Sequence, residues 1–344
     1  MGCMKEGLIR HDGGFDRYYF VEPGSDYGEI MWRDIGLLEK AELLPNPVFS
    51  KNKFLRLMHH LHFSFAINNR VSLPFQGMWK NAYALSHVKF EEGKKYCVIY
   101  TDISACRTDC GYLRSLKNME NTVMVMAMAN VVRSKEKLLD KRFPYFDYIF
   151  SWDKRDVEKY GMIYHPSYYS RIRMPVSSGY SADCFFIGNA KGRLKVLSEI
   201  YKKVTEAGGK ADFYITGVRK KERTEKGIHY NQKLPYSKVL EKNMNANCII
   251  EVLSGSQVGQ TLRAEEAIIG NKKLLTNNIH MKDNPYYGTG YVRIFKEIQD
   301  GDIRFIMERE DVDYQYRDDY SPILLIDHIN MMEEEKLGNY GTYI

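Results

Sequence analysis

The stretch at residues 248–278, CIIEVLSGSQVGQTLRAEEAIIGNKKLLTNN, decides the fold that we predict for this chain. It begins with an apolar run of strand-forming residues and continues through a loop rich in Gly and Ser. The spacing of an amphipathic helix carrying Arg263 and Glu266 comes next, and a second short apolar run follows it. Strand, helix and strand in this order are typical of a parallel sheet, so the stretch predicts part of an α/β domain.

The same alternation of strand and helix patterns recurs in two other parts of the chain. The first series has strand-like runs at residues 96–100 (YCVIY), 122–132 and 148–151, followed by a helical pattern that stops at Gly161. The second series has a strand at 184–187 (CFFI), a helix at 194–207, a strand at 212–216 and a helix at 236–244. Earlier residues predict short strands at 18–22 and 71–73. After Asn278 the pattern becomes irregular, and residues 321–332 then have the pattern of a closing helix.

Length and patterning together predict two domains. A chain of 344 residues exceeds the usual size of a single hydrophobic core. The turn-rich segment PVSSG at 175–179 separates the two α/β series. We therefore expect an N-terminal α/β domain over 1–178 and a second α/β domain over 179–322. A helix and tail over 323–344 then follow, and they can cross back to the first domain.

Composition limits the compartment and the partners. The six cysteines form no CxxC pair and several lie in apolar runs, which favours a reducing compartment. The N-terminus is polar, and the most apolar run, at 122–132, has about half the length of a spanning helix. The net charge of +6 suits phosphate-bearing ligands or an anionic membrane surface, but it is too evenly spread for nucleic acid. We expect a cytoplasmic protein that can contact the membrane face peripherally.

Two loops of the second domain leave strands and open helices, at residues 188–193 (GNAKGR) and 255–261. Ligands of parallel sheets bind at this edge, and the free N–H groups at helix starts favour phosphate. Lys191 and Arg193 add charge at the first loop and Arg263 at the second, while Thr261 can cap its helix. However, GNAKGR matches neither a Walker motif nor GxGxxG, and Arg263 and Glu266 are also spaced as an ordinary helical ion pair.

The second domain resembles the donor-binding half of GT-B glycosyltransferases. It is most similar to bacterial proteins assigned to lipopolysaccharide or capsule biosynthesis, and more distantly to family-four and spore-coat-type glycosyltransferases. The matching segments are FFIGNAKGRLKVL (185–197), DFYITG (212–217) and GQTLRAEEAIIGNKKLLTNN (259–278), with FDYIFSWDKRDVEKYG (146–161) before the hinge. The resemblance covers residues 147–278 and implies an α/β fold with two Rossmann-like domains facing a central cleft.

This resemblance implies a set of donor-binding residues. In the family, the glutamate that opens the EA-x-x-x-[GN] pattern binds the donor ribose, and here it falls on Glu266, with Ala267 and Asn271 in register. The diphosphate loop and its neighbouring strand ends fall on Gly259, Gln260, Thr261, Leu262 and Arg263, with Gly188, Asn189, Lys191, Arg193 and Gly217. One departure concerns stereochemistry: the retaining family-four enzymes carry a further glutamate where this chain has Val258.

The resemblance also implies a mechanism without a metal or other cofactor, in which Arg263 and Lys191 stabilise the departing nucleotide diphosphate. No DxD motif follows a predicted strand, and His59, His60 and His62 have no carboxylate or Cys at a ligand spacing nearby. An inverting enzyme needs a base in the first domain. Asp102, at the end of the strand at 96–100, is our candidate. Asp12 and Asp34 are rivals, and both are also typical turn or capping residues.

We therefore expect a glycosyltransferase that moves a sugar from a nucleotide-sugar donor to a glycan or lipid-linked acceptor in bacterial surface polysaccharide synthesis. Two alternatives stay open. A nucleotide-sugar 2-epimerase shares the fold and needs no acceptor. A catalytically degenerate scaffold protein would agree with Val258 at the position of a familiar glutamate.

Overall fold

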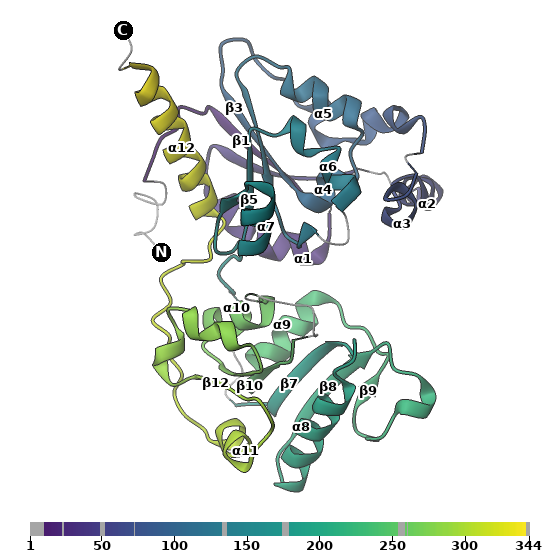
Figure 1. Cartoon of the computed structure of the whole chain (residues 1–344), viewed down its shortest axis with the longest axis vertical. Helices are drawn as coiled ribbons and strands as arrows, with labels where there is room; N and C mark the ends of the chain where they lie inside the picture. Colours follow the sequence, from purple (N-terminus) through teal and green to yellow (C-terminus); the bar gives the residue numbers. More distant parts are fainter. Residues whose placement is uncertain are drawn as a thin grey trace. The chain divides into compact units, whose positions relative to one another are not determined.

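The computed structural model describes residues 10–22, 24–48, 52–71, 73–132, 136–173, 179–253, 259 and 261–341. The chain forms two compact α/β units, and each is described by itself (Figure 1). Unit 1 comprises Met1–Ser170 together with Tyr320–Ile344, and unit 2 comprises Arg171–Asp319. Each unit therefore has its own sheet and its own core.

Unit 1 contains a six-stranded parallel sheet in the order β2-β1-β3-β4-β5-β6. Its strands are β1 (Arg17–Glu22), β2 (Ala41–Pro45), β3 (Tyr96–Thr101), β4 (Thr122–Ala127), β5 (Tyr148–Ser151) and β6 (Ile163–Tyr164). Its α-helices are α1 (Asp26–Met31), α2 (Lys53–His62), α3 (Phe65–Asn68), α4 (Asp102–Cys106), α5 (Cys110–Lys117), α6 (Glu136–Asp140), α7 (Lys154–Tyr160) and α12 (Ile323–Gly341). Short 3-10 helices are η1 (Arg33–Leu37), η2 (Gln76–Ala82), η3 (Ala84–His87) and η5 (Phe143–Tyr145).

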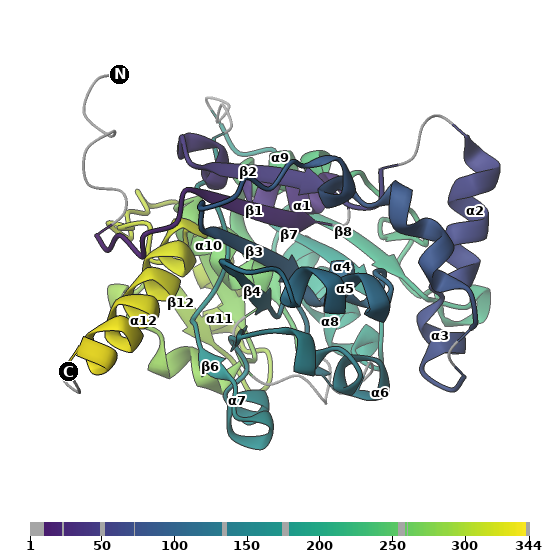
Figure 2. The same ribbon diagram turned by 90° about the horizontal axis from the view of Figure 1, so that it is seen from above.

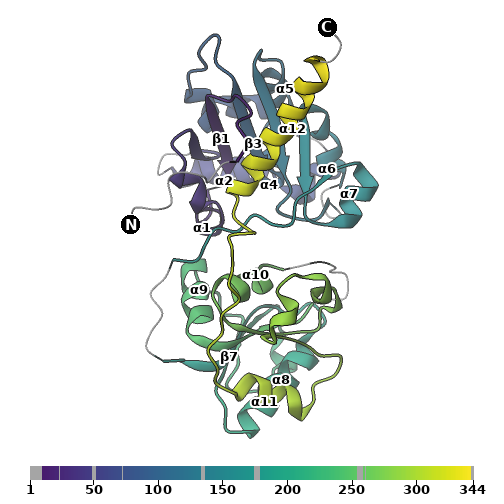
Figure 3. The ribbon, with the colours of Figure 1, turned by 90° about the vertical axis from the view of Figure 1, so that its left-hand side faces the viewer.

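The strands of unit 1 are buried on both faces, which explains their continuous apolar runs. Alternate residues point to opposite faces, so Val98 and Tyr100 of β3 join a core with Leu113 of α5. Tyr18 of β1 points to the other face, where its hydroxyl donates to Asn330 of α12. Figures 1 and 3 show α12 on the opposite side of this sheet from α4 and α5.

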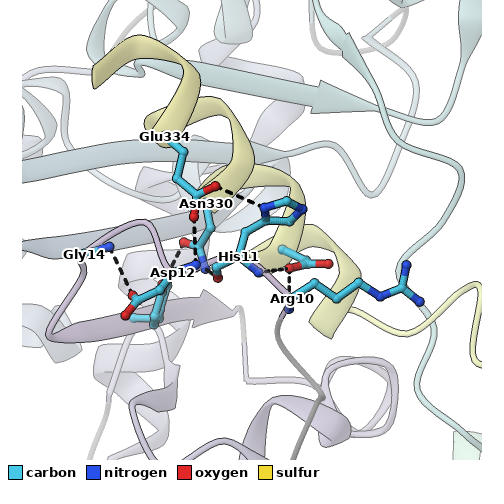
Figure 4. Close-up of polar contacts among 8 residues, drawn as sticks. Arg10, His11, Asp12, Gly14, Asn330 and Glu334 are labelled. Atoms are coloured by element: carbon cyan, nitrogen blue, oxygen red, sulfur yellow. Dashed lines mark hydrogen bonds and ion pairs between the residues drawn. The ribbon is translucent and has the colours of Figure 1, made fainter. Parts of the chain in front are cut away.

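Helix α12 is held against the start of the chain by side-chain hydrogen bonds (Figure 4). The Asn330 amide donates to the carbonyl of His11, at 2.7 Å, and accepts the Tyr18 hydroxyl, also at 2.7 Å. Asp327 accepts the backbone N–H groups of Arg10 and His11 at 2.7 and 2.8 Å. The last helix in the sequence thereby belongs to the first sheet in the fold.

Unit 2 contains a second six-stranded parallel sheet, in the order β12-β11-β10-β7-β8-β9. Its strands are β7 (Ala182–Asn189), β8 (Ala211–Thr216), β9 (His229–Tyr230), β10 (Ala246–Glu251), β11 (Lys273–Thr276) and β12 (Val292–Ile294). Its helices are α8 (Leu194–Glu206), α9 (Tyr236–Met244), α10 (Leu262–Ile269) and α11 (Asp300–Met307), with η6 (Lys220–Glu222), η7 (Ile279–Asp283) and η8 (Tyr287–Thr289). In this order the chain runs outward from β7 in one direction and restarts from β10 in the other, so the sheet has a topological switch point between β7 and β10.

Helices cover both faces of the second sheet. Ile200 of α8 and Ile303 of α11 pack with Phe186 of β7 in one core. On the other face, Val239 of α9 packs with Phe185 of β7. Neighbouring residues of one strand thus serve opposite cores, as the two-residue period of a strand requires.

Unit 2 begins at Arg171 and ends at Asp319, whereas the sequence-based prediction placed boundaries at 178/179 and 322/323. Arg171 pairs with Asp318 at 2.7 Å and donates to the Tyr316 carbonyl. These contacts hold the two ends of the unit 2 segment together. Ser321 instead donates to Asp34 of unit 1 at 3.1 Å. Residues 175–178 of the predicted hinge at 175–179 lie outside the described residues.

Two other parts of the sequence-based secondary structure are corrected. Val71 and Leu73 are not in a strand: they belong to the irregular connection between α3 and η2. The part after Asn278 that was expected to be irregular contains β12 and α11. Among the described residues, no helix has both the length and the apolar character that crossing a membrane requires.

Candidate functional site: a cationic crossing at the switch point of unit 2

The best-defined cluster of charged groups in unit 2 lies at the carboxyl ends of β7 and β10. Arg193 follows β7, and its guanidinium donates to the carbonyl of Val252, just after β10. Arg263 belongs to α10, which follows β10, and its guanidinium donates to the carbonyl of Ile187 in β7. The two side chains therefore cross the switch point in opposite directions and hold the two strand ends together. We call Arg193 and Arg263 in this arrangement the cationic crossing.

Both guanidinium groups lie against one aromatic ring. The distance to the centroid of the Phe186 ring is 5.4 Å for Arg193 and 5.1 Å for Arg263, within the range of a cation–π contact. Gly188 makes room for both. A Cβ there would stand 2.9 Å from Nη2 of Arg263 and 3.1 Å from Nη2 of Arg193. A side chain at position 188 would thus displace at least one of the two cations.

The charge of this pair is only partly compensated. In the described part of the chain, neither Arg193 nor Arg263 forms an ion pair with a carboxylate within 4.0 Å. The Nε atom of Arg263 is buried and has no hydrogen-bond partner among the described residues. Burial, together with the charge of Arg263, lowers the pKa of Arg193 to about 10, so Arg193 remains cationic at neutral pH. An anion at this edge would relieve their mutual repulsion.

Glu251 interacts electrostatically with both arginines, and sequence reasoning missed it. It is the last residue of β10 and only 1% exposed. Its two carboxylate oxygens accept the hydroxyls of Thr261 and Thr276. Burial raises its pKa, while these hydrogen bonds and the charges of the two arginines oppose the shift. The signal was present in the sequence as a lone acidic residue inside the apolar run CIIEVL.

Thr261 connects this buried carboxylate to the start of α10. Its backbone is extended, and its hydroxyl accepts the N–H of Arg263 at 3.3 Å, which makes Thr261 the N-cap of the helix. Leu262, the first residue of the helix, follows it. The N-terminus of α10 and its partial positive charge therefore lie next to the cationic crossing.

The remaining residues predicted for the first loop lie at the ends of β7 and β8. The Asn189 carbonyl accepts from the Arg193 guanidinium, at 2.9 Å from Nη2, and its side chain accepts the N–H of Lys191 at 3.1 Å. Gly217 has a φ of +74°, and a Cβ there would stand 2.7 Å from the Asn189 amide. Glycine is needed at 217 for this close approach. The side chain of Lys191 is exposed.

The structure describes only some of the residues predicted for the second loop. Gly259 has a φ of +102°, and its carbonyl accepts the Asn278 amide at 2.8 Å, which ties the loop to the end of β11. Gln260 and Val258 lie outside the described residues.

Glu266 does not join the cationic crossing. Its side chain is 3% exposed and lies between α9 and α10, where it accepts the Tyr236 hydroxyl and the Asn243 amide, the latter at 2.7 Å. Because Arg263 points to β7 and Glu266 to α9, the two do not form the helical ion pair that their spacing allowed. Both oxygens of the Glu266 carboxylate already accept hydrogen bonds within unit 2, and its ribose role stays a prediction.

The base candidates of unit 1 are placed as follows. Asp102 is fully buried at the carboxyl end of β3, and its carboxylate accepts the Ala129 N–H at 3.0 Å, which joins the ends of β3 and β4. Asp34 is 3% exposed and accepts the Ser321 hydroxyl. Asp12 accepts the N–H of Gly14 at 3.1 Å in a turn. Each has a structural role here, and a catalytic role for Asp102 stays a prediction.

Across the residues that the structure describes, no set of three or more His, Cys, Asp or Glu side chains is arranged to hold a metal ion. His59 and His62, which belong to the histidine-rich part of α2, pack against the Trp79 ring instead.

The comparisons with known proteins concern the fold. No family model matches the sequence, and no curated protein matches it. The structure entitled "OtsA apo structure" is similar with a TM-score of 0.52, at 9% identity over 94% of this chain and 98% of that one. UDP-GlcNAc 2-epimerase from Methanocaldococcus jannaschii has a TM-score of 0.45, at 10% identity over 95% and 100% of the two chains. The glycotransferase of kitacinnamycin has a TM-score of 0.46, at 10% identity over 92% and 99%.

At these identities structural similarity shows a fold and no activity. The similarity to OtsA extends over nearly the whole of both chains, and this chain has two parallel six-stranded sheets, each covered by helices. The chain therefore has an α/β fold of the two-domain GT-B type, which confirms the fold class predicted from the sequence.

Proposed function

We propose that the cationic crossing of unit 2 binds the diphosphate of a nucleotide-sugar, and that the protein is a glycosyltransferase acting on a glycan or lipid-linked acceptor. The observation that carries this proposal is the convergence of Arg193 and Arg263 on Gly188 at the switch point between β7 and β10. Open parallel sheets bind their ligands outside the carboxyl ends of the strands at such a point. A role in bacterial surface polysaccharide synthesis is part of the proposal and comes from the sequence resemblance.

The chemistry follows from where charge develops. When the bond between the anomeric carbon and the donor phosphate breaks, negative charge accumulates on the departing diphosphate. Two preplaced guanidinium groups and the N-terminus of α10 stabilise that charge without reorganising. Bidentate donation suits Arg for this task. Arg263 and Arg193 therefore stabilise the leaving group, and the exposed Lys191 adds a further positive charge near them.

A thermal-shift experiment tests the binding step. UDP, GDP, CDP and TDP are added separately, and inorganic phosphate serves as the control for non-specific anion effects. At a concentration of about a hundred times Kd, a nucleotide adds about 2.7 kcal/mol to the stability of the native state. We expect at least one nucleotide to raise the melting temperature and Arg263→Ala to abolish that shift. Arg304→Ala, which changes an exposed arginine of α11, should keep it.

The absence of a shift with all four nucleotides, or a full shift in Arg263→Ala, would contradict the proposal. Product analysis then separates the reactions. Incubation with the donor alone yields an epimerised sugar nucleotide from an epimerase, whereas a transferase needs an acceptor to release the diphosphate at an appreciable rate. A protein that binds donor but neither transfers nor epimerises the sugar is the degenerate scaffold.

A further inference from the structure

Residues 43–90 of unit 1 contain no Asp or Glu, although they contain six Lys or Arg residues. At the average frequency of this chain, 44 acidic residues in 344, a stretch of that length would hold about six. The stretch includes α2, α3 and η2. This segment therefore contributes no negative side chain to the surface of unit 1.

The same segment concentrates exposed apolar side chains. Nine of the fourteen large hydrophobic residues that are exposed in the described chain lie between positions 54 and 78. Figures 1 and 2 show α2 and α3 at the edge of unit 1, beyond α4 and α5. The nine are Phe54, Leu55, Leu57, Met58, Leu61, Ile67, Val71, Phe75 and Met78, and we call them the α2–η2 apolar surface. Exposed apolar side chains concentrated in one segment are typical of an interaction site.

Apolar and cationic residues occupy different stripes along helix α2. Phe54, Leu57, Met58 and Leu61 have the spacing of one helical stripe, and Phe54 and Leu57 are 67% and 54% exposed. Lys53, Arg56 and His60 form an adjoining stripe and are exposed as well. Only His59 of this helix is buried. The outward side of α2 therefore combines apolar and cationic side chains.

The apolar surface has a firm polar support. The Asn68 amide donates to the carbonyl of His62 at 2.8 Å and accepts the side-chain N–H of Gln76, also at 2.8 Å. The ring of His62 accepts the Trp79 indole N–H at 2.9 Å and contacts the Pro74 carbonyl at 2.6 Å. Phe75, which is 82% exposed, belongs to the connection that these hydrogen bonds hold. Hydrogen bonds within this segment therefore fix the local structure that leaves these apolar side chains exposed.

We propose that the α2–η2 apolar surface docks unit 1 onto an anionic lipid bilayer. Apolar side chains enter the region between headgroups and acyl chains, while Lys53, Arg56, Arg70 and Lys80 pair with lipid phosphates. A second copy of the chain fits less well, because a symmetric contact would bring the two cationic sets together with no carboxylate from this segment between them. The inference is independent of the donor site in unit 2.

Vesicle co-sedimentation of the full chain tests the proposal. One set of vesicles consists of phosphatidylcholine, and in the other part of it is replaced by phosphatidylglycerol. We expect the protein to bind the anionic vesicles and to be released by salt, because screening shortens the reach of surface charges. The double variant Phe54→Ser/Leu57→Ser should lose most binding. Lys53→Glu/Arg56→Glu should weaken it at least twentyfold, since each cation contributes roughly fivefold.

Matched controls separate the surface from general effects. Ile279→Ser removes a similarly exposed apolar residue, 54% exposed, from unit 2 and should bind as the wild type does. Lys220→Glu/Lys226→Glu reverses two exposed charges elsewhere and should reduce binding little. Because all of the changed side chains are exposed, melting temperatures should stay close to that of the wild type.

Three results would overturn the proposal. One is a wild-type protein that does not bind anionic vesicles at low salt. Another is equal binding by Phe54→Ser/Leu57→Ser and the wild type. The third is a dimer in sedimentation velocity that this double variant abolishes, because the occupant would then be a second copy. Failure of the nucleotide experiment on Arg263 would leave the vesicle result unaffected, so the two proposals fail separately.

Discussion

Glu251 illustrates how one residue organises the candidate site. A carboxylate with 1% exposure is costly unless its oxygens are paired, and both are paired here, with the hydroxyls of Thr261 and Thr276. Thr276 ends β11, and Thr261 is the N-cap of α10. Glu251 thus joins the ends of two strands to a helix cap, and it supplies negative charge beneath two arginines.

Removing this carboxylate should destabilise unit 2. Glu251→Ala leaves two hydroxyls without their acceptor and two guanidinium groups without a nearby anion, so we expect a loss of about 2–4 kcal/mol in the free energy of unfolding. Glu251→Gln should lose less, because an amide can still pair with both threonines. Urea denaturation of the unit 2 transition measures both. The control Glu199→Ala, at an exposed position on α8, should change the free energy of unfolding little. If Glu251→Ala were as stable as the wild type, the hydrogen bonds of Glu251 would not contribute to stability.

At the scale of elements, α12 covers one face of the unit 1 sheet, whose strands lie between Arg17 and Tyr164 in the sequence. Besides Asn330 and Asp327, it contributes Glu333, which is 4% exposed. The Glu333 carboxylate accepts the Tyr148 hydroxyl at 2.6 Å and pairs with Lys95 at 3.0 Å. Burial by itself raises the pKa of Glu333, but these partners outweigh it and leave the pKa below its ordinary value. The helix is therefore docked by a carboxylate that must be ionised.

A pH dependence follows from that lowered pKa. A carboxyl group with a lowered pKa in the folded state contributes stability above its unfolded pKa, and the contribution is lost as the pH falls through the folded value. We expect the free energy of unfolding of unit 1 to decrease below about pH 4.3, the ordinary value for Glu. Urea denaturation at a series of pH values should show a weaker decrease in Glu333→Gln. Glu335→Gln, exposed on the same helix, should follow the wild type, and an unchanged profile in Glu333→Gln would refute the assignment.

At the scale of the whole molecule, the two units differ in how the chain builds them. Unit 2 is one continuous segment, Arg171–Asp319, with a complete sheet and helices on both faces. Unit 1 needs two segments, because the face of its sheet that carries Tyr18 is covered by α12. The candidate anion site lies entirely within the continuous segment.

This difference predicts how fragments behave. A fragment of residues 171–319 should fold cooperatively and keep the nucleotide-dependent shift in melting temperature, because no residue of the cationic crossing comes from unit 1. A fragment of residues 1–170 should be poorly folded, because it exposes the apolar face that α12 covers. Circular dichroism and heat denaturation check both. A folded fragment 171–319 without the shift, when the full chain has it, would mean that unit 1 contributes to nucleotide binding.

Much of the architecture could be predicted from local pattern. The β-rich runs at 96–100 and 148–151 and the helix that carries Arg263 all occur near the expected positions. The short strand β12 was missed, because three residues are too few to show a period, and α11 was missed beside it. Among the site residues, charge and loop position pointed to Arg193 and Arg263, whereas Glu251 looked like part of a buried strand.

The sequence by itself determined the fold class and the loops that carry cationic residues, because hydrophobic period and glycine position act over a few neighbouring residues. Only the tertiary structure decided which of those residues meet. Sheet order places β7 beside β10, so that Arg193 and Arg263 cross at Gly188 over the Phe186 ring. Tertiary packing also directs Glu266 toward Tyr236 and Asn243 and places α12 on the first sheet. These outcomes depend on packing between segments far apart in the chain, and no local pattern encodes such contacts.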